Sequence, residues 1–209
     1  MNQAQQLRDG IQALGLDIDD AKQAKLLDYA ALLQKWNKTY NLTALRDPAQ
    51  TVSHHLLDSL TLLSYIEHAQ TMLDVGSGGG QPGIPTAICR PDLDITLLDA
   101  NTKKTTFLRQ AVIELGLNNV TVASGRVEEM HDKKVDVVTS RAFAELKDFI
   151  SLTAHLLNEQ GYWAAMKGVY PYEELEQVPE NVEIVKVDKL SVPMLEAERH
   201  MVIMKPKAV

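Results

Sequence analysis

The sequence predicts an α/β fold with a mostly parallel seven-stranded sheet, an antiparallel edge strand and an N-terminal helical cap. Three observations predict this fold. Strand-like and helical runs alternate from residue 71 onward. A glycine-rich stretch, 76–83, directly follows the first strand. Residues 1–68 show only helical patterns, so we expect them to form a cap and residues 69–209 to form one compact domain.

The cap is expected to hold three helices, at residues 3–15, 20–39 and 48–66. Asp19 or Asp20 can cap the second helix, because an aspartate side chain accepts hydrogen bonds from the first free N–H groups. This helix has apolar residues at helical spacing along one face, namely Leu26, Tyr29, Ala30, Leu33 and Trp36. That face should point toward the rest of the protein.

Seven strands are expected in the second part, at residues 71–75, 94–99, 119–123, 135–140, 161–167, 182–190 and 201–205. Helices are expected between them at residues 82–89, 102–115 and 145–157, the second ended by Gly116. The last two strands are joined by a non-helical loop that contains Pro193. We therefore expect them to pair antiparallel at the edge of the sheet.

Composition restricts the location and the partners of the chain. The 209 residues include one cysteine, Cys89, and no apolar run long enough to cross a bilayer, which predicts a cytoplasmic protein without a membrane partner. The net charge of −7 argues against a nucleic-acid partner, but residues 170–198 hold eight acidic residues and two lysines. The remainder is close to neutral and could present a basic face to RNA.

Acidic residues at the ends of the strands predict the ligand. Asp74 precedes the first glycine, Gly76, and could hold the ammonium group of an amino-acid ligand, whereas it would repel a pyrophosphate. Asp99 ends the second strand, where it can accept both hydroxyls of a ribose. Backbone groups of residues 125–128 could frame an adenine after the third strand. An amino acid, a ribose and an adenine together describe S-adenosylmethionine, and the pattern resembles class I methyltransferases.

The glycine loop alone leaves several functions open. Gly78, Gly80 and Gly83 also satisfy the G-x-G-x-x-G pattern of dinucleotide-binding proteins, so a nicotinamide-dependent oxidoreductase is one rival interpretation. The loop is also compatible with a purely structural turn, with a non-catalytic S-adenosylmethionine-binding regulator, and with a methyltransferase for a small molecule or a protein. Each of these proteins would share much of this glycine pattern.

Two classes of nucleic-acid methyltransferase do not fit the sequence. Enzymes that methylate exocyclic amines usually carry an (N/D)-P-P-(Y/F) turn after the fourth strand, where this chain has residues 139–143, Thr-Ser-Arg-Ala-Phe. Methylation at cytosine C5 needs a cysteine nucleophile, and Cys89 is expected inside the helix after the glycine loop. We therefore expect neither activity.

Six short motifs carry a more specific resemblance, at residues 35–43, 54–59, 80–85, 140–144, 166–168 and 198–200. Together they closely resemble the bacterial small-subunit rRNA guanine-N7 methyltransferase family, also called glucose-inhibited division protein B, over residues 26–205. The resemblance implies transfer of a methyl group from S-adenosylmethionine to N7 of a guanosine in 16S rRNA. It further implies 16S rRNA or the small ribosomal subunit as partner. We also expect a monomer and no metal.

The resemblance also implies individual site residues. Gly76, Gln81, Val127, Glu128 and Arg141 fall where the family contacts its cofactor, and Arg141 is a candidate substrate-positioning residue as well. Many relatives carry Gly-Pro-Gly-Leu-Pro-Gly where this chain has Gly-Gly-Gly-Gln-Pro-Gly. We therefore expect Gln81 to act through its backbone. Arg141 is expected to be unpaired at the rim of the crevice.

Four basic residues are candidate RNA contacts: Lys103, Lys167, Arg199 and His200. Each also has a structural interpretation. Lys103 could be a solvated residue at a helix start, and Lys167 could be an ion-pair partner. Arg199 and His200 could close the edge of the sheet, and the sequence does not decide between these roles.

The chemistry of guanine N7 explains the lack of a recognisable catalytic pair. N7 carries a free lone pair in neutral RNA, so no proton must leave before it attacks a methyl donor. A general base is therefore not required, and the site can act by positioning and electrostatics.

Overall fold

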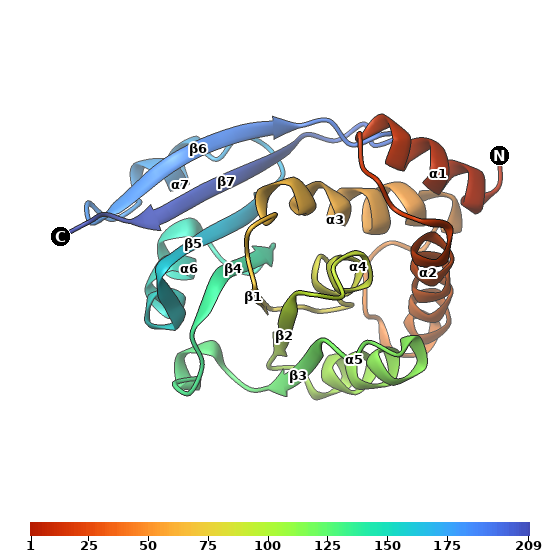
Figure 1. Cartoon of the computed structure of the whole chain (residues 1–209), viewed down its shortest axis with the longest axis horizontal. Helices are drawn as coiled ribbons and strands as arrows, with labels where there is room; N and C mark the ends of the chain where they lie inside the picture. The colour runs from red at the N-terminus through yellow and green to blue at the C-terminus, as the bar shows by residue number, and fades with distance from the viewer.

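The computed structural model describes residues 1–209 and contains a twisted seven-stranded sheet (Figure 1). The strands are β1 (Thr71–Val75), β2 (Asp94–Asp99), β3 (Val120–Ser124), β4 (Val135–Arg141), β5 (Leu157–Lys167), β6 (Val182–Leu190) and β7 (Arg199–Pro206). Their order is β3-β2-β1-β4-β5-β7-β6. The first five are parallel, while β7 is antiparallel to both β5 and β6. The predicted sheet is thus confirmed, with the reversed strand β7 lying one position inside the edge strand β6.

Helices cover both faces of this sheet (Figure 1). One face is covered by α1 (Gln3–Ala13), α2 (Asp20–Tyr40), the helical segment 48–65, α4 (Gly83–Cys89) and α5 (Thr102–Leu115). The other is covered by α6 (Leu146–Thr153) and the short α7 (Tyr172–Glu176), which the sequence did not predict. None of the helices combines the length and the apolar character that crossing a membrane would require.

The segment 48–65 is less regular than the single helix expected over residues 48–66. It consists of a 3₁₀ turn (Pro48–Gln50), a π-helical stretch (Val52–Leu57), the short α3 (Asp58–Leu60) and a second 3₁₀ stretch (Thr61–Tyr65). Changes of winding of this kind occur frequently at functional sites. This segment supplies residues to the site described below.

Two helix ends confirm the local signals in the sequence. The Asp19 side chain accepts a hydrogen bond of 2.8 Å from the Lys22 N–H and so caps α2. Gly116 ends α5 with φ +63°, a left-handed conformation that glycine adopts without a Cβ penalty. These interactions fix where two of the long helices begin and end.

The cap and the sheet share one hydrophobic core. A continuous cluster of 35 buried residues includes Leu7 of α1, Leu26 of α2 and Leu56 of the segment 48–65, together with Met72 of β1 and Phe107 of α5. The proposed division at residue 69 therefore marks a change of architecture within one core. This burial holds the cap against one face of the sheet, where α2 packs on α4 and α5.

The hydroxyl of Tyr29 joins the cap to the glycine loop, and a variant tests that connection. Tyr29 is fully buried, donates a hydrogen bond of 2.6 Å to the Gly79 carbonyl and accepts one from Gln81. Tyr29→Phe leaves both groups without this partner, so we expect the free energy of unfolding to fall by about 1–3 kcal/mol. Urea unfolding measures it.

Tyr172→Phe is the matched control, because Tyr172 is 72% exposed and the loss of its hydroxyl should leave stability unchanged. Equal stability of Tyr29→Phe and the wild type would show that the connection contributes nothing.

Candidate functional site

A cleft of about 200 Å³ lies at the carboxyl ends of β1, β2 and β3. Four of the residues predicted to bind a cofactor line it: Gly76, Asp99, Val127 and Glu128. Phe143, just after β4, closes one side. The parallel strands place these residues together because their carboxyl ends meet at one edge of the sheet.

The first glycine of the loop is required by its surroundings. Gly76 has φ +68°, and a Cβ there would lie 2.9 Å from Cδ2 of Phe143. The N–H groups of Gly76 and Ser77 both donate to the Leu98 carbonyl, at 2.8 and 3.0 Å. The loop therefore bends sharply over the end of β2 and leaves backbone exposed to the cleft.

Asp99 both builds the loop and faces the cleft. Its Oδ2 accepts a 2.9 Å hydrogen bond from the Gly78 N–H, and its Oδ1 accepts one of 2.8 Å from the Asn101 N–H. Each carboxylate oxygen has a second lone pair available as an acceptor. Asp99 therefore fits the predicted role of accepting the two hydroxyls of a ribose.

Asp74 is fully buried, and only one of its oxygens has a partner. Oδ2 accepts a 3.0 Å hydrogen bond from the Gly83 N–H at the start of α4, while Oδ1 has none. A Cβ on Gly83 would lie 2.2 Å from Leu97 Cδ2 and 2.7 Å from Asp74 Oδ2, so only glycine fits. The Gly83 N–H at the start of α4 is therefore bound to Asp74 and is not free for a ligand.

The unpartnered oxygen gives Asp74 the property that an ammonium ligand needs. Burial raises the pKa of Asp74 to about 8, and the Gly83 N–H and the charge of Arg141 oppose this only in part. A buried carboxylate oxygen without a donor is stabilised when a cation is placed beside it. Asp74 therefore fits the amino end of an amino-acid ligand.

The turn after β3 supplies the third predicted contact. Val127 is buried at the start of a 3₁₀ turn (Val127–Glu129), and its neighbour Glu128 forms an ion pair of 2.6 Å with Arg126 at the rim. Both Val127 and Glu128 line the cleft. Their backbone therefore borders the place where a base would lie.

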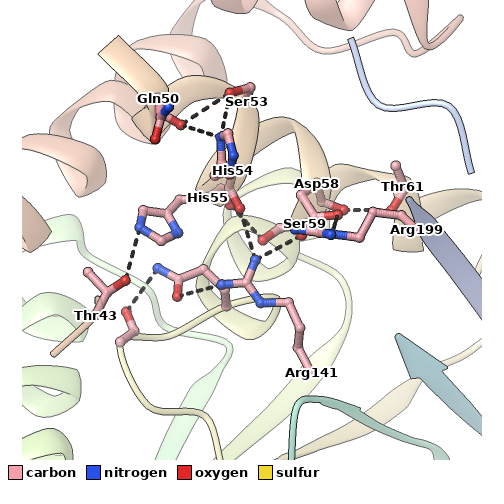
Figure 2. Close-up of polar contacts among 12 residues, drawn as sticks. Thr43, Gln50, Ser53, His54, His55, Asp58, Ser59, Thr61, Arg141 and Arg199 are labelled. Carbon is pink, nitrogen blue, oxygen red and sulfur yellow. Dashed lines mark hydrogen bonds and ion pairs between the residues drawn. The ribbon is translucent and has the colours of Figure 1, made fainter. Parts of the chain in front are cut away.

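Arg141 is not unpaired, contrary to the sequence-based expectation. Its NH1 group donates to Asp58 Oδ2 and to the His54 carbonyl, each at 2.9 Å, and NH2 donates to Gln81 Oε1 at 3.3 Å (Figure 2). The ion pair with Asp58 joins β4 to the cap. The sequence could not reveal it, although Asp58 belongs to the motif at residues 54–59.

The side chain of Gln81 makes contacts that were not expected from the sequence. The side chain is buried, donates to the hydroxyl of Tyr29 and accepts from Arg141. The expected backbone contact stays a prediction, but the side chain links α2 to the end of β4. Tyr29 and Asp58 are thus the two site residues that the sequence reasoning missed.

A second cavity, of about 420 Å³, adjoins the first. Arg141, Lys167 and Arg199 line it together with cap residues of the segment 48–65. Ala142, with φ +59°, lines this cavity, and its neighbour Phe143 lines the cleft. A non-glycine residue in this strained conformation between two cavities is typical of functional sites.

The four candidate RNA contacts lie in different surroundings. Lys167 pairs with Glu174 at 2.8 Å, and the Arg199 Nε lies 3.4 Å from Asp58 Oδ1. Lys103 is exposed in the first turn of α5 and lines neither cavity. His200 is 4% exposed, with Nδ1 2.7 Å from the Gly168 carbonyl. The structure thus brings Lys167 and Arg199 to Arg141, but not Lys103 or His200.

Solved structures of other proteins share this fold. A ribosomal protein L11 methylase from Lactobacillus delbrueckii subsp. bulgaricus superposes with a TM-score of 0.57, at 18% identity over 73% of this chain and 77% of that one. The glycopeptide N-methyltransferase MtfA gives 0.62, at 11% identity over 77% of this chain and 100% of that one. The fold is that of a class I methyltransferase.

Sequence relatives define the family. The family model described as rRNA small subunit methyltransferase G matches residues 22–202. Proteins named ribosomal RNA small subunit methyltransferase G from Neisseria meningitidis serogroup C (strain 053442) and Chromobacterium violaceum are 66% and 54% identical over 207 and 200 residues. The alignment with the Neisseria protein covers 99% of this chain and 100% of that protein, and the alignment with the Chromobacterium protein covers 95% and 96%. The chain belongs to this family.

The cofactor follows from the family and the class. It is S-adenosylmethionine, as predicted from the sequence, and the nicotinamide interpretation is set aside. Asp99 in the cleft and Asp74 near the end of β1 fit it, because the free oxygen of Asp74 can accept from its ammonium group and Asp99 can accept from its ribose.

The raised pKa of Asp74 predicts pH-dependent binding of S-adenosylhomocysteine, which carries the same ammonium group. Asp74 is protonated in the free protein up to about pH 8, whereas an ammonium beside it favours the carboxylate. Affinity should therefore rise between about pH 6.5 and pH 8.5, with release of a proton. Isothermal titration calorimetry in buffers of different ionisation enthalpy measures both.

The contribution of Asp74 to the stability of the free protein changes with pH in the opposite direction. Because the folded pKa lies above the unfolded one, the contribution of Asp74 is fully present below about pH 4 and is lost as the pH rises through about 8. Asp74→Asn should bind more weakly and lose the pH dependence, whereas Asp94→Asn, at the exposed start of β2, should keep it. Wild-type affinity that is constant with pH would contradict this role.

Proposed function

We propose that the chain transfers a methyl group from S-adenosylmethionine to N7 of a guanosine in 16S rRNA, free or within the small ribosomal subunit. The observation that carries this proposal is the second cavity. It presents Arg141 and Arg199 next to the cofactor cleft, and Ala142–Phe143 forms the boundary between the two. A cationic cavity beside a methyl-donor cleft suits a polyanionic substrate. The family model and the relatives, all named for small-subunit rRNA, support the same substrate.

The proposed reaction needs no general base. The bound cofactor supplies an electrophilic methyl group on a sulfonium. Guanine N7 has a free lone pair, so the chain needs only to align the base and exclude water. The titratable groups nearby support this mechanism, because Asp58 is paired with Arg141 and burial lowers the pKa of His55 to about 4.

Cys89 also supports chemistry without a covalent intermediate. It is buried within α4, and burial raises the pKa of its thiol to about 12. A thiol of this kind is a poor nucleophile at neutral pH. Methylation at cytosine C5 is therefore disfavoured on physical grounds.

Each residue has a proposed role. Asp74 and Asp99 hold the ammonium and ribose groups of the cofactor, and Arg141 orients the target nucleotide at the boundary of the two cavities. Gly76, Gly78, Gln81, Val127 and Glu128 complete the cofactor cleft. Lys103, Arg199 and Lys167, in order of decreasing exposure, are proposed RNA contacts. The burial of His200 favours a structural role within β7, which lies between β5 and the edge strand β6. We further propose a monomer that acts in the cytoplasm without a metal ion.

A methylation assay tests the proposed function. Purified protein is incubated with radiolabelled S-adenosylmethionine and either small ribosomal subunits that lack 7-methylguanosine, their naked 16S rRNA, or bulk cell protein. We expect label in 16S rRNA, recovered as 7-methylguanosine after nuclease digestion and mass spectrometry. Label in protein, or in a different nucleoside, would overturn the proposal.

Arg141→Lys tests the role of the guanidinium while keeping its charge. Arg141 contacts Asp58 and His54 from one nitrogen and Gln81 from another, and a lysine lacks this planar fork because its N–H groups share a single nitrogen. We therefore expect turnover to fall by about tenfold to a hundredfold through lost positioning. Single-turnover methylation measures it. Arg141 lines the second cavity and not the cofactor cleft, so we expect the rise in melting temperature with S-adenosylhomocysteine to persist. The cofactor contact expected for Arg141 from the sequence stays a prediction, and loss of this rise would support it.

Arg126→Lys is the control. It changes an arginine at the rim of the cleft that is 69% exposed and paired with Glu128, and it should leave turnover close to wild type. Wild-type turnover in Arg141→Lys would show that the reaction does not need the guanidinium group.

A further inference from the structure

One buried carboxylate lies between two arginines in the second cavity (Figure 2). The side chain of Asp58 has no exposed surface. Its Oδ2 lies 2.9 Å from the NH1 group of Arg141, and its Oδ1 lies 3.4 Å from the Nε of Arg199. Two arginines share a single aspartate, so the cluster of Asp58, Arg141 and Arg199 carries a net positive charge.

This charge is not shared by the lysine of the cavity. Lys167 is neutralised by Glu174 at 2.8 Å and donates a further hydrogen bond of 2.9 Å to the Ala144 carbonyl. The surplus charge therefore belongs to Arg141 and Arg199. They come from β4 and β7, and Asp58 comes from the cap, so three distant parts of the chain meet here.

Both guanidinium groups keep donors free. Arg141 uses N–H groups for Asp58, His54 and Gln81, whereas Arg199 donates only to the Glu198 carbonyl. Each side chain is 25% exposed, and the remaining N–H groups have no partner in the protein. A guanidinium presents its N–H groups as a planar fork that matches two oxygens of a phosphate.

The carboxylate of Asp58 would by itself oppose the binding of an anion in the second cavity. Because it is buried and lies beside both arginines, it can instead hold them in place. Without Asp58, two like charges would repel each other and take up separate positions. With it, both guanidinium groups are fixed side by side at the wall of one cavity.

We propose that the second cavity binds one backbone phosphate of the RNA substrate between Arg141 and Arg199, and that Asp58 is the positioning residue for both arginines. The proposal rests on RNA being the substrate and deepens it by naming the group that is held. A phosphate fixed here would anchor the strand beside the boundary at Ala142–Phe143, where the target base must enter.

Salt-dependent binding of RNA to the full chain tests the phosphate contact. Protein with bound S-adenosylhomocysteine is titrated with a 16S rRNA transcript at several salt concentrations in a filter-binding assay. Each phosphate contact contributes about 0.7–0.9 to the slope of log K against log salt. Arg199→Gln should lower the slope by about one such contact and weaken binding about tenfold. Arg199→Lys should keep the slope but bind more weakly, because the charge stays and the fork is lost.

Arg8→Gln is the matched control, because Arg8 is an exposed arginine of α1 that lines none of the cavities described here, and its slope should equal that of the wild type. A wild-type slope in Arg199→Gln would overturn the proposal. Binding is measured without methylation, so this result is distinct from failure of the guanine-N7 reaction.

Asp58→Asn separates positioning from simple charge, because the two predict opposite signs. If Asp58 only neutralised its neighbours, removing its charge would strengthen RNA binding. If it positions both arginines, binding should weaken about tenfold with the slope retained. An increase in melting temperature with S-adenosylhomocysteine shows that Asp58→Asn is folded. If Asp58→Asn does not fold, the salt dependence of RNA binding by Arg199→Gln still tests the phosphate site. Tighter binding by folded Asp58→Asn would overturn the positioning role.

Discussion

The glycine-rich loop keeps its shape because two carboxylates at the ends of neighbouring strands accept its backbone N–H groups. Asp99 binds the N–H of Gly78, and Asp74 binds that of Gly83. The same two residues were predicted from the sequence as ligand contacts only. The two roles are compatible, because a carboxylate held by a backbone amide keeps further lone pairs for a ligand. Loss of either acid would therefore disturb the loop as well as the binding of the cofactor.

A chain of polar contacts extends from this loop across the cap. The Gly79 carbonyl, Tyr29, Gln81, Arg141 and Asp58 are linked in succession by hydrogen bonds. Every member is buried or half-buried, so each unsatisfied group would carry a desolvation cost. The cap therefore does more than cover one face of the sheet, since it fixes Arg141 at the wall of the second cavity. The hydrophobic core shared by the cap and the sheet holds these partners in register.

The sequence predicted those features that depend on local chemistry. The bounds of β1 and β2, the Asp19 cap and the end of α5 at Gly116 all follow from short-range patterns, as does the position of Asp99 at a strand end. The features that were missed depend on residues far apart in the chain. Arg141 and Asp58 are 83 positions apart, and Tyr29 and Gln81 are 52 apart. No periodicity or turn signal reports such pairs, which is why Arg141 was expected to be unpaired.

We propose that Asp74 and Asp99, at the ends of β1 and β2, orient the cofactor so that its sulfonium faces the boundary at Ala142–Phe143. A crystal structure with S-adenosylhomocysteine tests it most directly. The expected result is the amino group within hydrogen-bond distance of Asp74 Oδ1, the ribose hydroxyls on Asp99, and the sulfur directed toward the second cavity. A ligand with its sulfur directed toward the turn at Val127–Glu129, or with Asp74 still without a partner, would contradict the claim.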